Sequence, residues 1–311
     1  MAPRVLVTPR SLTRDGDPAL ELLRKAGFEL VLSSPGRQPD ESELLRLLPG
    51  CVGWLAGVER ISAVVLRSAP ELKVISRNGT GLDNVDLEAA RRLGIRVLRA
   101  EGANARGVAE LTVGLMLALL RSIPHGDARL KAGAWERRRG LEIGERTVGL
   151  VGCGRVGRLV ATYALGLGAR VLAHDACPAG SFQPAGFSWA EFGQVLAGAD
   201  LLSLHCPAQA GGAPLIGTAE LARMKRGAYL VNTARASLVD AGAVLRALEE
   251  GGLAGFATDV FAEEPPSPSA LLAHPRVIAT PHVGGYTDES VEKATRVAVE
   301  NLLAALAEGR A

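Results

Sequence analysis

One stretch constrains the possible fold of this chain more than any other. It consists of a strand-like apolar run, a glycine pattern and a helix-like run. Residues 148–164 read VGLVGCGRVGRLVATYA and contain the pattern G-x-G-x-x-G. In this setting Gly152 would make a tight turn, Gly154 would let a phosphate approach the backbone, and Gly157 would let the helix pack closely on the strand. Unpaired N–H groups at the helix N-terminus favour a negatively charged ligand. The stretch therefore predicts a dinucleotide site, and a glycine-rich turn without a ligand is the alternative.

A carboxylate at the end of the next strand-like run indicates which dinucleotide binds. Asp175 ends the run RVLAHD and follows Gly157 by eighteen residues, close to the spacing of about twenty in dinucleotide-binding folds. Asp175 would accept hydrogen bonds from the adenosine ribose and would repel a 2′-phosphate. The next residues, Ala176 and Cys177, supply no cation to offset that repulsion. The pattern predicts NAD as the cofactor, with a plain turn-forming aspartate as the alternative.

Short apolar runs alternate with helix-length segments along the whole chain. The alternation is typical of parallel sheets built from β-α-β units. A long helical stretch over 104–121 separates two series of strands, so the economical prediction is two α/β domains. The first series is 4–8, 28–33, 51–57, 72–76 and 95–99, and the second is 147–152, 170–175, 200–205, 228–233, 255–260 and 276–281.

The composition points to a small ligand. The 311 residues include 35 Lys and Arg against 33 Asp and Glu, which favours neither a nucleic-acid nor a membrane partner. The four cysteines show no paired spacing, so we expect neither disulfides nor a metal site, as suits a cytoplasmic protein. The N-terminus lacks a signal pattern, and the longest apolar run, 113–120, is bounded by Glu110 and Arg121, so no segment is expected to span a bilayer.

Three residues capable of chemistry follow successive strand-like runs. Arg235 lies in VNTARASLVD, Glu264 in TDVFAEEPP and His282 in VIATPHVGG. Ligands of open α/β sheets bind at the carboxyl ends of the strands, so a cation, a carboxylate and an imidazole there form a plausible catalytic set. The alternatives are a solvated arginine, a surface carboxylate and a loop histidine.

Seven motifs resemble, in their order along the chain, those of the D-isomer-specific 2-hydroxyacid dehydrogenases. Within that family they are most similar to the motifs of the phosphoglycerate dehydrogenases. The motifs are RNGTGLDNVDLEAA, VAELTVGLML, LKAGAWERR, GCGRVG, VNTARASLVD, DVFAEEPP and PHVGG. The resemblance implies that Arg235 binds the substrate carboxylate and polarises the carbonyl, that His282 is the acid/base, and that Glu264 pairs with His282. It also implies that the loop of Arg77, Asn78, Gly79 and Thr80 binds the substrate carboxylate through backbone N–H groups.

The resemblance further implies an interrupted domain. Residues 1–99 and 285–311 would form a flavodoxin-like substrate domain around an inserted Rossmann NAD-binding domain, 100–284, both with doubly wound parallel sheets. The helix near 104–121 and the basic WERRR segment (135–139) resemble a dimerisation region, so a homodimer is expected. Besides Gly152, Gly154, Gly157 and Asp175, the implied cofactor-binding residues are Arg155, Val156, His205, Cys206, Pro207, Thr233, Ala234, Asp259 and Gly284.

One departure concerns the substrate, a small 2-hydroxy or 2-keto acid. Phosphoglycerate dehydrogenases tend to carry an arginine after the third strand, whereas this chain reads LAGVE (55–59). The cations left to bind a phosphate are Arg60 and Arg77 of the same chain, and Arg137 of a dimer partner. Hydroxypyruvate or glyoxylate reduction is therefore the alternative activity, and an NAD-sensing scaffold like the C-terminal binding protein corepressors is the non-enzymatic one. No regulatory domain is expected beyond Ala311.

Overall fold

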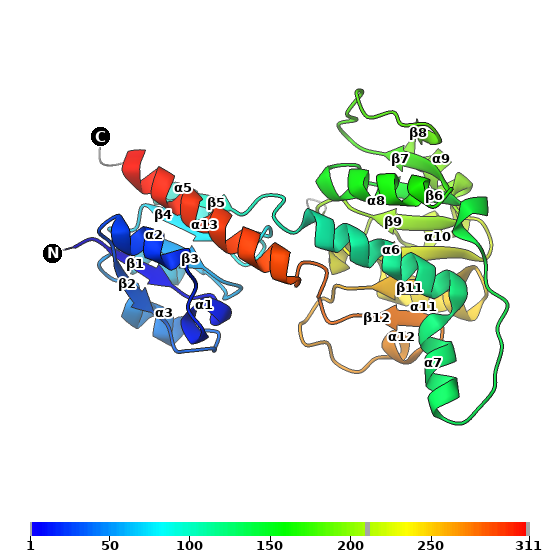
Figure 1. Cartoon of the computed structure of the whole chain (residues 1–311), viewed down its shortest axis with the longest axis horizontal. Coiled ribbons are helices and arrows are strands. Elements are labelled where there is room, and N and C mark those ends of the chain that lie inside the picture. Colours follow the sequence, from blue (N-terminus) through cyan, green and yellow to red (C-terminus); the bar gives the residue numbers. More distant parts are fainter. Residues whose placement is uncertain (1, 209–211, 309–311) are drawn as a thin grey trace. The chain divides into compact units, whose positions relative to one another are not determined.

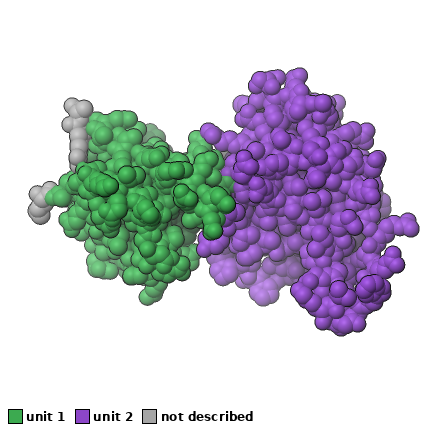
Figure 2. Space-filling model, in the orientation of Figure 1, with its two compact units in different colours: residues 1–104, 288–311 green, residues 105–287 purple. Residues whose placement is uncertain are grey.

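The computed structural model describes residues 2–208 and 212–308, which form two compact units (Figure 2). Unit 1 consists of residues 1–104 and 288–311, and unit 2 of residues 105–287. Each unit is built on its own parallel sheet with helices on both faces, as Figure 1 shows. The predicted fold class, two α/β domains with parallel sheets, is confirmed.

Unit 1 contains a five-stranded sheet in the order β2-β1-β3-β4-β5. The central strands β1, β3 and β4 are largely buried, because successive side chains point to opposite sides and helices cover both faces, whereas the edge strands β2 and β5 are partly exposed. Trp54 of β3 enters a core under α3 to α5, and its neighbour Leu55 enters a second core under α2 and α13. The strands are β1 (Arg4–Val7), β2 (Glu29–Leu32), β3 (Cys51–Ala56), β4 (Val74–Arg77) and β5 (Arg96–Arg99). The helices are α1 (Arg10–Arg14), α2 (Leu20–Lys25), α3 (Glu41–Leu47), α4 (Ala63–Arg67), α5 (Leu87–Arg92) and α13 (Asp288–Glu308).

The last helix, α13, returns the chain to unit 1. Ala298, Val299 and Leu302 of this helix are fully buried in the second core. The Ser76 hydroxyl donates a hydrogen bond of 2.7 Å to the Ala298 carbonyl, and the Asn78 side chain donates one of 3.3 Å to Thr295. These contacts attach α13 to β4 and to the loop that follows it.

Unit 2 contains a seven-stranded sheet in the order β12-β11-β10-β9-β6-β7-β8. The strand order reverses between β6 and β9, which is the place where open α/β sheets bind nucleotides. The strands are β6 (Thr147–Val151), β7 (Arg170–His174), β8 (Phe187–Trp189), β9 (Leu201–Leu204), β10 (Ala228–Asn232), β11 (Leu253–Thr258) and β12 (Val277–Ala279). The strand β8 is one that the apolar runs do not predict, because three residues at a sheet edge are too short for a periodic pattern.

The helices of unit 2 cover both faces of its sheet. On one face α6 and α8 share a core with β6 and β7, and on the other α9, α10 and α11 enclose a second core. The helices are α6 (Ala105–Arg121), α7 (Ile123–Lys131), α8 (Arg155–Gly166), α9 (Phe192–Gly198), α10 (Thr218–Arg223), α11 (Ala241–Glu249) and α12 (Ala270–Ala273), with 3₁₀ turns η1 (Ile143–Glu145) and η2 (Ala236–Leu238). Among residues 2–208 and 212–308, no single helix is long and apolar enough to cross a membrane; only α6 and α7 together, bent by 62°, reach that length and composition.

Candidate active site

The three glycines after β6 have distinct steric surroundings. Gly152 has φ +92°, and a Cβ there would lie 2.6 Å from the backbone nitrogen of Cys206. A Cβ on Gly157 would lie 2.2 Å from the carbonyl oxygen of Gly152, so α8 packs against the turn with no room for a side chain. Gly154 has no such neighbour within 4 Å. The turn and the helix contact therefore require glycine, and the open backbone at Gly154 fits a pyrophosphate at the start of α8.

Asp175 follows β7 and lies beside this turn. Its Oδ2 accepts a hydrogen bond of 2.6 Å from the backbone N–H of Cys153, and its Oδ1 accepts one of 2.8 Å from that of Cys177. Burial, together with the charge of Asp175, raises the pKa of the Cys153 thiol to about 11. The backbone thus fixes the carboxylate, whose remaining lone pairs can accept ribose hydroxyls.

The segment His205, Cys206 and Pro207 follows β9, next to the turn. The backbone N–H of His205 donates to the Val151 carbonyl at 2.7 Å, and its Nε2 lies 2.9 Å from the hydroxyl of Ser203. Burial lowers the pKa of the His205 imidazole to about 4. The ring is therefore neutral near pH 7, and it places no positive charge at this edge of the sheet.

Arg235 leaves the carboxyl end of β10 on a loop organised by Asn232. Asn232 is 1% exposed, and its side-chain amide donates to the Arg235 carbonyl at 2.8 Å and accepts from the Ala234 N–H at 3.1 Å. Thr233 is held to Thr112 of α6 by a hydroxyl contact of 2.8 Å. The Arg235 guanidinium donates to the Ala234 carbonyl at 2.7 Å. The sequence pattern did not single out Asn232, although a polar residue ending an apolar strand could have indicated it.

His282 and Glu264 meet beyond β12 and β11. The Nδ1 atom of His282 lies 2.7 Å and 2.8 Å from the two carboxylate oxygens of Glu264. Both side chains remain about half exposed within the structure. Because Nδ1 faces the carboxylate, it carries the ring proton, and Nε2 is left to exchange a proton with a ligand.

Asp259, at the end of β11, fixes the loop that carries His282. It is 1% exposed. Its Oδ1 accepts hydrogen bonds from the Thr280 hydroxyl at 2.6 Å and the Val283 N–H at 2.9 Å, and its Oδ2 accepts one from the Gly284 N–H at 2.8 Å. His282 lies between these residues with φ +54°, a left-handed conformation that non-glycine residues seldom adopt. The sequence suggested Asp259 and Gly284 as cofactor contacts; the geometry adds an anchoring role that the pattern did not indicate.

The loop of residues 77–81 belongs to unit 1. Arg77 is 9% exposed, and its guanidinium donates to the Asn84 side chain and to the Asn78 carbonyl. The backbone N–H of Asn78 donates to Ala56 and that of Gly79 to Arg77. Within the described part of the chain, no acceptor takes up the N–H groups of residues 80 and 81. Those two groups are therefore candidates for binding an anion.

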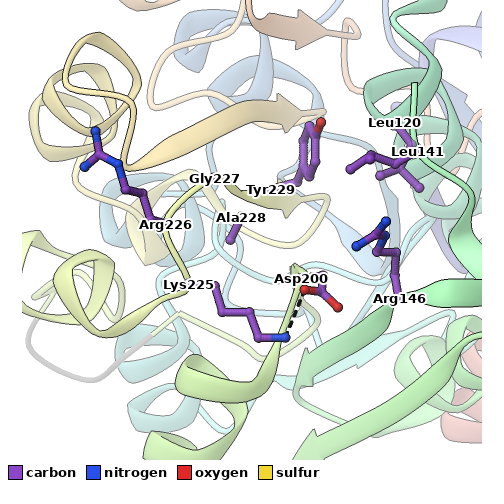
Figure 3. A pocket seen from close by; sticks show the side chains of 9 residues that line it. All are labelled: Leu120, Leu141, Arg146, Asp200, Lys225, Arg226, Gly227, Ala228 and Tyr229. Atoms are coloured by element: carbon purple, nitrogen blue, oxygen red, sulfur yellow. Dashed lines mark hydrogen bonds and ion pairs between the residues drawn. The ribbon is translucent and has the colours of Figure 1, made fainter. Parts of the chain in front are cut away.

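A separate cavity lies at the amino ends of β6, β9 and β10. Its volume is about 150 Å³. The Lys225 ammonium donates a hydrogen bond of 2.9 Å to Asp200, and Figure 3 marks this contact with a dashed line. Burial alone would raise the pKa of Asp200, but hydrogen bonds from the Thr147 backbone and Lys225, with the charges of Lys225 and Arg146, hold it below its usual range. The cavity is at the edge of the sheet opposite the turn and His282, so its ion pair belongs to the scaffold.

Comparison with known proteins identifies the family. Residues 113–284 match the model described as D-isomer specific 2-hydroxyacid dehydrogenase, NAD binding domain. This match covers more than half of the chain. The chain belongs to the D-isomer specific 2-hydroxyacid dehydrogenase family. Unit 2 is therefore the NAD-binding domain of the family, and the sequence-based prediction of the family and its cofactor is confirmed.

Individual relatives agree with this assignment. The chain is 37% identical to the D-3-phosphoglycerate dehydrogenase of Sus scrofa over 274 residues, which are 87% of this chain and 51% of that protein. This chain thus spans about half the length of the curated relatives it matches. It is similar to the TT0316 protein of Thermus thermophilus (39% identity, TM-score 0.87, 98% and 97% of the chains) and to a glyoxylate reductase of Paecilomyes thermophila (26% identity, TM-score 0.87, 99% and 96%).

Alanine substitutions at two glycines of the turn should affect different properties, stability at Gly157 and NADH binding at Gly154. Gly157→Ala forces a Cβ against the Gly152 carbonyl and should lower the free energy of unfolding by about 1–3 kcal/mol, the usual cost of overpacking. Gly154→Ala meets no neighbour, so it should change stability much less while weakening NADH binding. Denaturant unfolding and NADH fluorescence titration measure the two effects. A Gly154→Ala protein with normal NADH affinity would place the pyrophosphate elsewhere.

The lowered pKa of His205 predicts a pH dependence of stability. Its folded-state pKa lies below the ordinary 6.5 of the unfolded chain, so between these values the unfolded state binds more protons, and stability is lost as the pH falls. From pH 7 to pH 5 this one group should cost about 2 kcal/mol. Urea unfolding at both pH values should show a smaller loss for His205→Gln than for the unmodified protein. Equal losses would mean that His205 titrates normally.

Proposed function

We propose that this protein is an NAD-dependent dehydrogenase that transfers hydride between NAD(H) and a small D-2-hydroxy or 2-keto acid. The observation that carries the proposal is the hydrogen-bonded pair of His282 and Glu264 at the carboxyl edge of an NAD-binding sheet. In this proposal residues 100–284 bind the cofactor, and residues 1–99 with 285–311 bind the substrate. The carboxylate Asp175, with no cation in the two residues after it, supports NAD over NADP.

In the proposed mechanism His282 moves the proton. NAD supplies the hydride acceptor in oxidation, and NADH the hydride donor in reduction. As hydride leaves C2 of the hydroxy acid, Nε2 of His282 takes the hydroxyl proton, and it returns that proton when the keto acid is reduced. Glu264, bound to Nδ1, orients the ring and stabilises the positive charge that the ring gains.

Arg235 of unit 2 would bind the substrate's carboxylate. A guanidinium has five N–H donors in a planar fork, and two of them match the two oxygens of a carboxylate. Its positive charge would also stabilise the oxygen at C2, where negative charge develops. In unit 1 the N–H groups of residues 80 and 81, held by the scaffold of Arg77, Asn78 and Gly79, are the donors that we propose for the acid.

We propose small unphosphorylated acids such as hydroxypyruvate and glyoxylate as substrates. A phosphate usually takes several Arg or Lys contacts. Arg77 is engaged in the scaffold of its own loop, and residues 57–59 after β3 supply no cation. The phosphoglycerate dehydrogenase relatives support 3-phosphoglycerate as the second candidate substrate.

We also propose a homodimer in the cytoplasm. The side chains of Ile123 and Leu130 on α7 are 55% and 60% exposed, and Trp135 after the helix is 82% exposed. Large apolar side chains gathered in one segment support an association surface. All four cysteines are thiols, which is consistent with a reducing compartment.

Steady-state kinetics test the proposed activity and its substrate. With NADH, glyoxylate and hydroxypyruvate should be reduced at least as efficiently as 3-phosphohydroxypyruvate, and NADPH should be a much poorer cofactor. A preference of about a hundredfold for the phosphorylated acid, equivalent to about 2.7 kcal/mol, would favour phosphoglycerate dehydrogenase instead. A protein that binds NADH but reduces none of these acids would favour the NAD-sensing scaffold.

His282→Ala separates proton transfer from cofactor binding. The variant should lose at least about a thousandfold in kcat, within the range that general acid–base catalysis contributes. Its dissociation constant for NADH should stay within about twofold, because the proposed pyrophosphate and ribose contacts lie at the turn and Asp175. Turnover near the unmodified rate would remove His282 from the mechanism.

A further inference from the structure

The loop after β3 contains a buried carboxylate that the proposed chemistry does not use. Glu59 is 1% exposed. Its Oε1 accepts a hydrogen bond of 2.9 Å from the backbone N–H of Gly57 and another from the hydroxyl of Thr8, which follows β1. The Thr8 oxygen in turn accepts a hydrogen bond of 2.9 Å from the indole N–H of Trp54, a fully buried residue of β3. One carboxylate thereby joins the ends of β1 and β3.

Because burying the Glu59 carboxylate is costly, its hydrogen bonds determine the position of the loop after β3. A buried carboxylate is costly unless its oxygens accept hydrogen bonds. Residues 2–208 and 212–308 supply no ion-pair partner for Glu59, so the bonds from Gly57 and Thr8 are what hold it. A Cβ on Gly57 would lie 2.7 Å from Oε2 of Glu59 and 3.1 Å from Cα of Pro9, so the backbone closes directly over the carboxylate.

Asn84 connects this loop to the proposed substrate loop. Its side-chain amide donates to the Glu59 carbonyl at 2.6 Å, and its oxygen accepts from Nε of Arg77 at 3.2 Å. The strands β3 and β4 are neighbours with Ala56 opposite Arg77, and the N–H of Asn78 donates to the Ala56 carbonyl at 2.8 Å. The two loops therefore leave the same edge side by side and are joined by hydrogen bonds.

The inward turn of Glu59 also determines what the loop exposes. Val58, the residue before it, is 52% exposed, whereas the carboxylate is shielded from solvent. Glu59 thus places no charge on the surface of unit 1. Its effect on a ligand would have to act through the loop backbone and Asn84.

We propose that Glu59 is a positioning residue for the 2-keto acid: its carboxylate fixes the loop after β3 through Thr8 and Gly57, and Asn84 joins the backbone of that loop to the loop that presents the N–H groups of residues 80 and 81. The inference rests on the proposed function, because those N–H groups are its proposed carboxylate donors. It assigns to the Glu59–Thr8 pair an effect on substrate affinity and none on NADH affinity or on the proton transfer at His282.

A double-mutant cycle in the full chain tests the assignment. Glu59→Ala and Thr8→Val should each raise the KM for glyoxylate by about tenfold, with kcat and the KM for NADH within about twofold. Because both residues act through one network, the double variant should be no worse than the poorer single variant. Glu59→Gln keeps an oxygen acceptor for Gly57 and Thr8, so it should restore most of the affinity.

Glu41→Ala is the matched control. Glu41 also accepts a hydrogen bond from a hydroxyl, that of Ser62 at 2.7 Å, but it is exposed and lies at the start of α3. Its loss should leave the KM for glyoxylate unchanged. If Glu59→Ala does not fold, Thr8→Val alone carries the test, since valine matches the shape of threonine and removes only the hydroxyl.

Three results would overturn the inference in distinguishable ways. A lower melting temperature with an unchanged KM for glyoxylate would make Glu59 a purely structural residue. Additive effects of Glu59→Ala and Thr8→Val on KM would show that they do not act through one network. An unmodified protein that reduces no keto acid would refute the proposed function itself, and this inference with it.

Discussion

The candidate site depends above all on the carboxylate of Asp259. Its two oxygens accept hydrogen bonds from Thr280, Val283 and Gly284, and so they determine the path of the loop that presents His282. His282 has a positive φ, which costs on the order of 1 kcal/mol and persists only where the surroundings fix it. With that backbone fixed, the ring meets Glu264 through Nδ1. The geometry of the His282–Glu264 pair therefore depends on one buried carboxylate at the end of β11.

The same principle operates at other strand ends. Asn232 at the end of β10 bonds to the loop of Arg235, and Glu59 after β3 bonds to the backbone of its own loop. Loops have no ladder or helix to satisfy their backbone groups, so a buried polar side chain can fix their conformation by supplying the missing partners. In this protein these side chains occupy the carboxyl edges of the two sheets, where the proposed ligands would bind.

Parallel topology is what brings distant segments to these edges. In unit 2 the turn after β6, Asp175 after β7 and His205 after β9 follow strands that are neighbours in the sheet. Sheet pairing places their carboxyl ends side by side, although the residues are far apart in the sequence. At the amino edge, Asp200 pairs with Lys225 and accepts a hydrogen bond from the Thr147 backbone, which supports the start of β6.

The sequence by itself determined the alternation of strands and helices, the glycine turn and the family, because these follow from short-range periodicity and from steric needs at single residues. It also indicated Glu264 and His282, which the structure brings within hydrogen-bonding distance. It could not supply the strand order, the short strand β8 or the anchoring roles of Asp259, Asn232 and Glu59. Thr8 and Glu59 are 51 residues apart, and Asp259 and Thr280 are 21 apart. Only tertiary structure decides such partners, because a buried polar side chain finds its hydrogen-bond partner after the strands have packed.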